Sequence, residues 1–294
     1  MKTNIKGVGV ALVTPFDTKG KIDFDALGRL VSHVIDGGVD YLVALGTTAE
    51  TPTLSLEERN DIVACIRSNN RKNLPMIIGV GCNDTHHVIE DMRALDLTGA
   101  AAILSVTPYY NRPSQRGLYE HYKAIADAAP APVLIYNVPS RTGVNITAET
   151  TLRLAHEVRN ICGIKEASGS INQMAYLLKG RPEGFMVISG DDAMTLPLLS
   201  IGGDGVISVL ANAFPAPFTK MVAAFLHGDI ATASALQMRL LEVTDALFEE
   251  GNPVGVKSAL SAMGLIRNVL RLPLVSGSDA LVAKFRRLAQ ENKL

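Results

Sequence analysis

Lys165 is the side chain of this sequence best suited to covalent chemistry. It ends a short apolar segment within Ile161-Cys162-Gly163-Ile164-Lys165-Glu166-Ala167-Ser168. Burying an ammonium costs free energy, so such a lysine either finds an anionic partner or loses its proton. A neutral amine in a dry pocket attacks carbonyl carbons and forms a Schiff base. The alternative is an ion pair with Glu166. Adjacent strand residues point to opposite faces, however, so we expect Glu166 to face the helices or the rim.

Three more polar positions could take part in such chemistry. Tyr136 lies in the apolar segment Leu134-Ile135-Tyr136-Asn137-Val138, where a phenol either fills the core or transfers protons. The hydroxyls and backbone N–H groups of Thr47 and Thr48 could bind a small carboxylate, or simply form a turn after a strand. The guanidinium of Arg141, in a turn-rich loop, could bind a carboxylate with two hydrogen bonds or remain solvated.

Other catalytic patterns are missing from the sequence. His86 and His87 are adjacent and cannot both face one ligand on a helix. The sequence has no H-E-x-x-H motif, no P-loop and no G-x-S-x-G motif. We therefore expect neither a metal nor a bound cofactor.

The segments that must position these residues alternate in character. Short apolar runs rich in Val and Ile, without strict alternation, are typical of parallel strands buried on both faces. We expect strands at Val8–Val13, Tyr41–Leu45, Pro75–Val80, Ala101–Val106, Val133–Val138, Cys162–Glu166, Phe185–Ser189 and Gly205–Leu210. We expect helices at Asp23–Asp36, Ser55–Ser68, Asp84–Leu97, Gln115–Ala128, Thr147–Val158 and Ile171–Leu178. Ser55 and Glu58 form a capping-box pattern at the start of the second of these helices.

Alternating strands and helices predict right-handed βα units, in a doubly wound sheet or in a closed (β/α)8 TIM barrel. The count of eight and the even spacing favour the barrel. No G-x-G-x-x-G motif follows the first apolar run, where a dinucleotide-binding sheet would place it. Because the active residues of such a barrel lie at the C-terminal ends of its strands, the polar residues that follow the apolar runs become candidates.

The chain changes character near residue 229. From there to residue 294 it has no strand pattern and reads as helices at Ala231–Phe248, Val254–Met263 and Ser278–Ala289. We therefore expect a catalytic barrel over residues 1–228 and a C-terminal helical region over residues 229–294.

Composition narrows the function further. The 294 residues are 47% hydrophobic and 19% charged, and 28 basic side chains nearly balance 29 acidic ones. This balance argues against partners such as nucleic acid or an anionic membrane surface. The apolar stretch near the start superficially resembles a signal peptide, but a buried first strand explains it better. No apolar run is long enough for a membrane span, and three scattered cysteines fit a reducing, cytoplasmic location.

Several motifs resemble those of the dihydrodipicolinate synthase family, within the pyruvate-dependent class I aldolases and lyases. They follow the family's order over nearly the whole chain: ALGTTAET at 44–51, VTPYYN at 106–111, YNVPSRTG at 136–143, GIKEAS at 163–168, GDD at 190–192 and NPVGVK at 252–257. The resemblance implies the barrel and a Schiff-base lysine. It also implies condensation of pyruvate with L-aspartate 4-semialdehyde on the diaminopimelate route to lysine, without a cofactor.

The resemblance also implies residue roles. Lys165 would attack the pyruvate ketone, and Tyr136 would donate and accept protons through a relay completed by Thr47 and Tyr110. Tyr110 would reach across a dimer interface, implying a homodimer or, more usually, a homotetramer. The remaining substrate contacts would come from Thr48 at the pyruvate carboxylate, Ile207 through its main chain, Gly190 lining the pocket, and Arg141 at the carboxylate of the second substrate.

Two alternatives remain at this point. N-acetylneuraminate lyases and related sugar-acid aldolases share the family but typically lack an arginine at the position of Arg141, which favours the synthase. A non-catalytic barrel that only binds ligands is the alternative of another class. The joint presence of Lys165, Tyr136, Thr47 and Tyr110 argues against it.

A regulatory site departs from the family pattern. Many relatives are inhibited by lysine, and Asn83 and Tyr109 match residues of that effector site. Leu56, Arg59 and His87 stand where sensitive enzymes commonly carry histidines and a glutamate. Since His87 would replace the glutamate that pairs with the effector's ammonium, we predict weak or absent feedback.

Overall fold

A computed structural model describes residues 5–294 of the chain. Eight parallel strands follow one another as hydrogen-bonded neighbours in a closed barrel, in the order of the sequence. This arrangement confirms the (β/α)8 TIM barrel and excludes the doubly wound sheet. The strands are β1 (Gly7–Ala11), β2 (Tyr41–Ala44), β3 (Met76–Gly79), β4 (Ala102–Val106), β5 (Val133–Asn137), β6 (Ile161–Glu166), β7 (Met186–Ser189) and β8 (Gly205–Ser208).

The helices fall between and after the strands. They are α1 (Phe24–Asp36), α2 (Leu56–Asn69), α3 (Thr85–Ala94), α4 (Gln115–Ala128), α5 (Pro139–Thr142), α6 (Ala148–Glu157), α7 (Ile171–Gly180), α8 (Thr195–Ser200), α9 (Pro215–Leu226), α10 (Ile230–Glu249), α11 (Val254–Ala262) and α12 (Asp279–Glu291). Three single turns of 3-10 helix complete the structure, namely η1 (Thr47–Ala49), η2 (Thr51–Thr53) and η3 (Leu210–Asn212).

Local signals explain where several helices begin. At α2, Ser55 accepts a hydrogen bond from the backbone N–H of Glu58 at 3.1 Å, and the Glu58 carboxylate accepts one from the N–H of Ser55 at 3.0 Å. This reciprocal pair confirms the capping box expected from the sequence. Thr147 caps α6 in a similar way, accepting from the N–H of Thr150 at 3.3 Å.

The chain forms two compact units. The first contains residues 5–6 and Pro75–Ile207, and the second contains Gly7–Leu74 and Ser208–Leu294. The division into domains near residue 228 stays a prediction.

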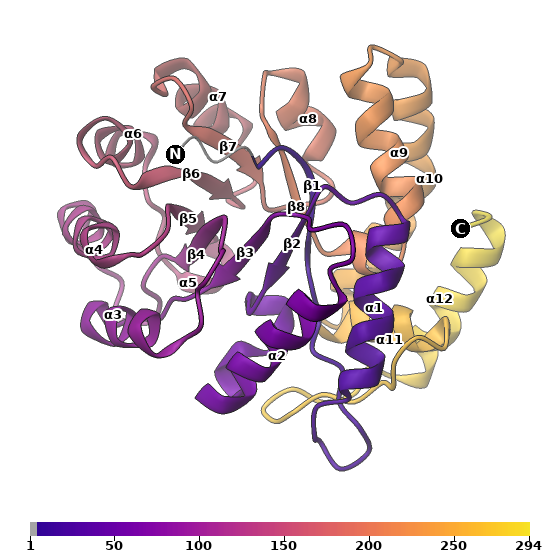
Figure 1. The fold of residues 1–294 in the computed structure, drawn as a ribbon. Helices are drawn as coiled ribbons and strands as arrows, with labels where there is room; N and C mark the ends of the chain where they lie inside the picture. Colours follow the sequence, from indigo (N-terminus) through magenta and orange to yellow (C-terminus); the bar gives the residue numbers. More distant parts are fainter. Residues whose placement is uncertain (1–4) are drawn as a thin grey trace. The chain divides into compact units, whose positions relative to one another are not determined.

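In the first unit, β3 to β8 are successive parallel neighbours joined by helices. Every residue of β5 and β7 is buried, as expected for strands covered on both faces. Figure 1 shows α4, α6 and α7 on the outer side of this part of the sheet, and α6 contacts β6.

In the second unit, the C-terminal helices pack on one another. Helix α10 contacts α9, α11 and α12, and Figure 1 shows α9 and α10 running side by side. The side chain of Asn212, just after β8, donates to the carbonyl of Ala11 at 2.8 Å and accepts from the N–H of Val13 at 3.2 Å. These bonds connect the end of the last strand's loop to the first strand. The C-terminal helices predicted from the sequence are all present, and none of their bounds is shifted by more than two residues.

Candidate active site

Lys165 and Tyr136 lie together on two neighbouring strands. They are register partners of β6 and β5, so their side chains point to the same face of the sheet. The Lys165 ammonium nitrogen lies 4.2 Å from the centroid of the Tyr136 ring. The lysine is 5% exposed and the tyrosine 7% exposed. An amine and a phenol are therefore close to each other in a nearly closed environment.

The surroundings of Lys165 favour its neutral form. The pKa of its ammonium is lowered to about 8, mainly by burial and in smaller part by the positive charge of Arg141. The negative charge of Asp192 acts in the opposite direction. With a pKa near 8, a useful minority of the amine is unprotonated at neutral pH, which is what attack on a carbonyl requires.

Glu166 faces the helices, as expected from strand geometry. Its carboxylate accepts from the Asn137 side-chain amide at 3.0 and 3.1 Å, from Gln173 of α7 at 2.8 Å, and from the backbone N–H of Ser168 at 2.7 Å. These neutral donors satisfy a carboxylate that is wholly buried. Glu166 therefore holds the ends of β5 and β6 together.

Gly190 follows β7 and borders the Lys165 side chain. Its N–H donates to the carbonyl of Glu166 at 2.8 Å. A Cβ atom at this position would lie 3.0 Å from Cε of Lys165 and 2.7 Å from Cβ of Ala167. The absent side chain at position 190 thus leaves the room that the lysine occupies.

Arg141 is carried by the short helix α5 after β5. The hydroxyl of Thr142 lies within hydrogen-bond distance of two carbonyls of this turn, 3.2 Å from that of Val138 and 2.9 Å from that of Val144, and its one proton is shared between them. Gly143 ends the helix in the left-handed conformation, with φ of 72°. Arg141 itself is exposed. A rigid turn therefore presents a cation to solvent close enough to influence Lys165.

Tyr110 projects from the loop after β4. It is 89% exposed and has a left-handed backbone with φ of 70°, which is uncommon for a residue other than glycine. Neighbouring Tyr109 is 37% exposed. Ile207, in β8, is buried at 1% exposed.

The predicted effector residues lie in the same unit. The loop of Tyr109 and Tyr110 is joined to Asn83 by Asn111, whose side-chain amide donates to the carbonyl of Asn83 at 3.0 Å. His87 lies on α3 and its side chain is exposed. Its Nε2 atom lies 3.8 Å from a carboxylate oxygen of Asp91, which is one helical turn further along the chain.

Thr47 and Thr48 belong to the other compact unit, in η1 directly after β2. Thr48 is buried, and its hydroxyl accepts a hydrogen bond from the side-chain amide of Asn252 at 3.1 Å. Thr47 is half-buried. The two hydroxyls therefore stand at the C-terminal end of their strand, where barrel enzymes place functional groups.

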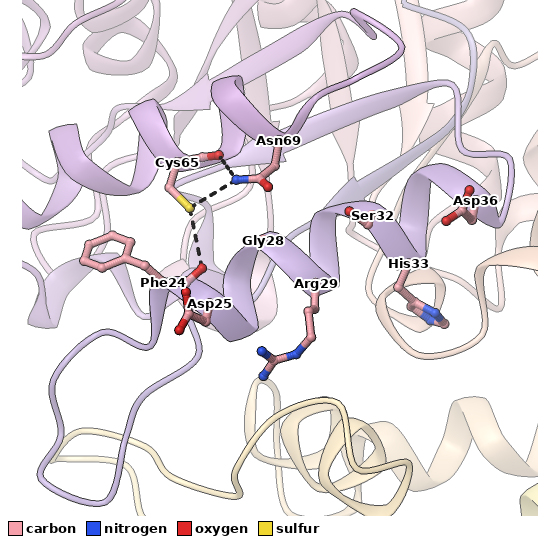
Figure 2. Close-up of a pocket in the computed structure, with 9 residues that line it drawn as sticks. All are labelled: Phe24, Asp25, Gly28, Arg29, Ser32, His33, Asp36, Cys65 and Asn69. Carbon is pink, nitrogen blue, oxygen red and sulfur yellow. Dashed lines mark hydrogen bonds between the residues drawn. The ribbon is translucent and has the colours of Figure 1, made fainter.

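An open pocket on the second unit offers no comparable chemistry. It has a volume of about 740 Å³ and lies along α1 and α2. Figure 2 shows the Asn69 amide donating to the Cys65 carbonyl, and the Cys65 thiol donating to the carbonyl of Phe24. Burial raises the pKa of the Cys65 thiol, which keeps it protonated. None of the predicted site residues lines this pocket.

Two further features are absent from residues 5–294 of the structure. Across this range, no group of three or more His, Cys, Asp or Glu side chains is arranged to hold a metal ion. No helix within the same range has the length and apolar character needed to cross a membrane.

Comparison with known proteins decides the family. The sequence profile of the Dihydrodipicolinate synthetase family matches residues 4–292. The chain belongs to this family. A curated 4-hydroxy-tetrahydrodipicolinate synthase from Parabacteroides distasonis is 50% identical over 288 residues, covering 98% of this chain and 97% of the relative.

Solved structures of dihydrodipicolinate synthases agree over the full length. One, described as the first monomeric dihydrodipicolinate synthase variant, is 40% identical with a TM-score of 0.95 and covers 100% of this chain and 98% of its own. The chloride-inhibited enzyme from Acinetobacter baumannii, solved in complex with pyruvate, is 40% identical with a TM-score of 0.94. The match covers 98% of this chain and 99% of that enzyme's chain.

Among residues 5–294 of this member of the dihydrodipicolinate synthetase family, two buried lysines have a pKa lowered to about 8, Lys165 and Lys257. Lys257 is fully buried, forms an ion pair with Glu50 and donates to the carbonyl of Val269 at 2.9 Å. Those bonds occupy its nitrogen. Lys165 instead faces a phenol, and is the better candidate for an amine that reacts.

Two features of the site have no local signal in the sequence. Asp192 belongs to the GDD motif at 190–192, but its effect on Lys165 depends on the fold bringing the two together. The contact between Asn252 and Thr48 joins residues 204 positions apart. No local pattern reports such a pairing.

Proposed function

We propose that this protein catalyses the condensation of pyruvate with L-aspartate 4-semialdehyde, the reaction of 4-hydroxy-tetrahydrodipicolinate synthases. The single observation that carries the proposal is the buried amine of Lys165 beside the ring of Tyr136, with its pKa lowered to about 8. The membership of the family and the names of the relatives support it.

The first half of the reaction uses Lys165 as the nucleophile. The neutral amine adds to the ketone carbon of pyruvate, and loss of water gives a cationic imine. This imine withdraws electrons from the methyl group, so a base can remove a proton and leave an enamine. Tyr136 serves as proton donor and acceptor in these steps, since its phenol belongs to the side chain adjacent to the amine.

The second half joins the two substrates. The enamine carbon attacks the aldehyde carbon of the semialdehyde and restores the imine. The amino group of the second substrate then attacks the imine carbon, and this new C–N bond closes the ring. Cleavage of the bond to the Lys165 nitrogen releases the lysine as a free amine and leaves the cyclic product. Arg141 binds the carboxylate of the semialdehyde, because it presents an exposed guanidinium near Lys165.

The resemblance to the family and the local geometry support the remaining proposed roles. Thr48 binds the pyruvate carboxylate, and Thr47 with Tyr110 relays protons between Tyr136 and solvent. Ile207 contacts pyruvate through its main chain, and Gly190 leaves room for the adduct. The high exposure of Tyr110 supports a homo-oligomer in which its ring is covered by a second copy. Three free cysteines support a cytoplasmic location.

Covalent trapping tests the proposal. Pyruvate and borohydride should give a stable adduct that mass spectrometry of peptides locates at Lys165, and Lys165→Ala should lose it. An aldehyde screen should then show turnover with L-aspartate 4-semialdehyde and little with N-acetylated amino sugars. Failure of the wild-type protein to form the adduct would favour a non-catalytic barrel, and preference for the sugar would favour a lyase.

A further inference from the structure

The turn that carries Thr47 and Thr48 has an unusual backbone. Leu45 and Glu50, at its two ends, have left-handed φ values of 55° and 56°. Such conformations persist in non-glycine residues only where the surroundings hold them. Two threonine side chains supply part of that hold: the hydroxyl of Thr51, within the same turn, donates to the carbonyl of Gly46 at 2.9 Å, and the hydroxyl of Thr14, after β1, donates to that of Ala49 at 2.8 Å.

A buried ion pair supplies a further part of that hold. Glu50 is 2% exposed and pairs with Lys257 of α11, which is fully buried. The second oxygen of Glu50 accepts from the backbone N–H of Arg271 at 2.9 Å. The Lys257 nitrogen also lies 4.2 Å from the centroid of the Phe16 ring. The carboxylate that ends the turn is thus fixed entirely by the C-terminal part of the chain.

A buried ion pair of this kind gives little stability over well-packed apolar residues, because both charges lose their hydration. Its best-attested use is to specify one arrangement of the chain. Here that arrangement is the approach of α11 to the turn after β2. Arg271 strengthens the same approach, donating to the carbonyl of Thr53 at 2.9 Å and to the Glu58 carboxylate at 2.7 Å.

Asn252 contacts the turn directly. Its side-chain amide donates to the Thr48 hydroxyl at 3.1 Å, five residues before Lys257 in the sequence. A hydroxyl has one proton and two lone pairs. Because the amide takes a lone pair, the proton of Thr48 is directed to another acceptor. A hydroxyl held in this way is a donor, which suits a carboxylate ligand.

We propose that the segment from Asn252 to Lys257 is a positioning element for the pyruvate-carboxylate site. Asn252 orients the Thr48 hydroxyl as a donor, and the Lys257–Glu50 pair fixes the turn that carries it. This inference rests on the proposed function, in which Thr48 binds the carboxylate. Neither Asn252 nor Lys257 touches the reacting atoms, so both act through Thr48.

The test measures the pyruvate concentration that gives half-maximal borohydride adduct at Lys165. Asn252→Leu removes the amide donor at similar size and should raise this concentration about tenfold or more, as expected for a disturbed hydrogen bond to a charged ligand. The adduct yield at saturating pyruvate should stay near that of the wild type. In a Thr48→Val background, Asn252→Leu should have little further effect, because the group it orients is gone.

The ion pair is tested by the double variant Glu50→Gln/Lys257→Met, which removes both charges and leaves no unpaired one. It should fold, and should still raise the half-saturating concentration several-fold. Lys284→Met is the matched control: it breaks a C-terminal ion pair, with Glu249, and should leave the value unchanged.

The outcomes separate this inference from the proposed function. If the wild type forms the adduct but Asn252→Leu and the double variant keep its half-saturating concentration, the positioning role is wrong and the proposed function stands. Additive effects of Asn252→Leu and Thr48→Val would equally overturn it. If the wild type forms no adduct at any pyruvate concentration, the proposed function fails, and the inference falls with it.

Discussion

The amine of Lys165 lies over the aromatic ring of Tyr136, 4.2 Å from its centroid, and the two residues are register partners on adjacent strands. A parallel register places such partners on one face, so the contact is set by the sheet rather than by a loop. Sites carried on strands are held more precisely than sites on loops. The electrostatics of this pair lead to predictions that do not depend on the second substrate.

The rate of adduct formation should depend on pH through the amine of Lys165. Its pKa is lowered to about 8, mainly by burial. At subsaturating pyruvate, the trapping rate should rise about tenfold per pH unit well below this value and level off above it, because only the neutral amine attacks. The measurement is a pH–rate profile with borohydride as the trap. A profile that stays flat from pH 6 to about pH 9 would contradict the role of this amine.

Two substitutions should move that profile in opposite directions. The charge of Arg141 lowers the pKa of Lys165, and the charge of Asp192 raises it. Arg141→Gln should therefore shift the inflection to higher pH, and Asp192→Asn should shift it to lower pH. Adduct formation should survive Arg141→Gln, whereas use of the aldehyde should fall sharply. Arg153→Gln, on the exposed side of α6 in the same unit, serves as the control and should leave the inflection in place. Shifts in the same direction for both site variants would refute the electrostatic account.

Gly190→Ala should slow adduct formation at Lys165. The added methyl would lie 3.0 Å from Cε of the lysine and 2.7 Å from Cβ of Ala167, so the lysine must move. We expect the trapping rate to fall about tenfold or more, because small displacements at a reacting atom are costly. Gly169→Ala, at a position with open space around it but a strained φ of 73°, tests whether backbone disturbance alone has this effect. If the trapping rate falls equally in the two variants, crowding of the Lys165 side chain is not the cause of the loss.

Lys165→Met should stabilise the protein at neutral pH. The folded pKa of Lys165 lies below that of the unfolded chain, so unfolding takes up protons between pH 8 and about 10.5. The cost of burying the charge is therefore complete below about pH 8 and disappears as the pH rises toward 10.5. We expect a gain of about 1–3 kcal/mol in the free energy of unfolding at pH 7, shrinking at alkaline pH.

Denaturant titrations at pH 7 and near pH 10 would measure this change, with Lys284→Met as a surface control. If the variant is less stable than the wild type at pH 7, burial of the Lys165 ammonium does not destabilise the folded protein, and the prediction is wrong.

Feedback by L-lysine should be weak or absent. The sequence resemblance predicts that His87 stands where relatives sensitive to lysine carry a glutamate that pairs with the ammonium of the inhibitor. The side chain of His87 is 60% exposed and lies near Asp91. A steady-state assay should show no inhibition at sub-millimolar L-lysine, and His87→Glu should increase sensitivity. Strong inhibition of the wild type would mean that the remaining effector residues suffice.

Much of the fold was predictable because its signals are local. The eight strands appear as Val- and Ile-rich runs, and the start of α2 is marked by Ser55 and Glu58. Helices α5, α8 and α9 were not anticipated. The first is a single turn, α8 has no capping side chain, and α9 begins at Pro215 without one. Helices α5 and α8 are too short to show a helical periodicity in the sequence. For α9, a proline at the first position is a weaker signal of a helix start than a capping serine.

The site was predictable in part. Lys165 and Tyr136 end or occupy buried strands, so their types and positions were visible in the sequence. The influence of Asp192 on the amine, and the bond from Asn252 to Thr48, depend on residues far apart in the chain. Spacing within one segment carries no information about such pairs.

The pairing of Glu50 with Lys257 spans 207 positions, which has a consequence during synthesis. The turn with Thr47 and Thr48 leaves the ribosome early, yet the groups that shape it are translated last. A nascent or truncated chain that stops before Asn252 already contains Lys165. It lacks the side chains of Asn252 and Lys257, which we propose position the Thr48 hydroxyl. On the proposed role of this segment, full affinity for pyruvate is reached only once the chain has been translated through Lys257.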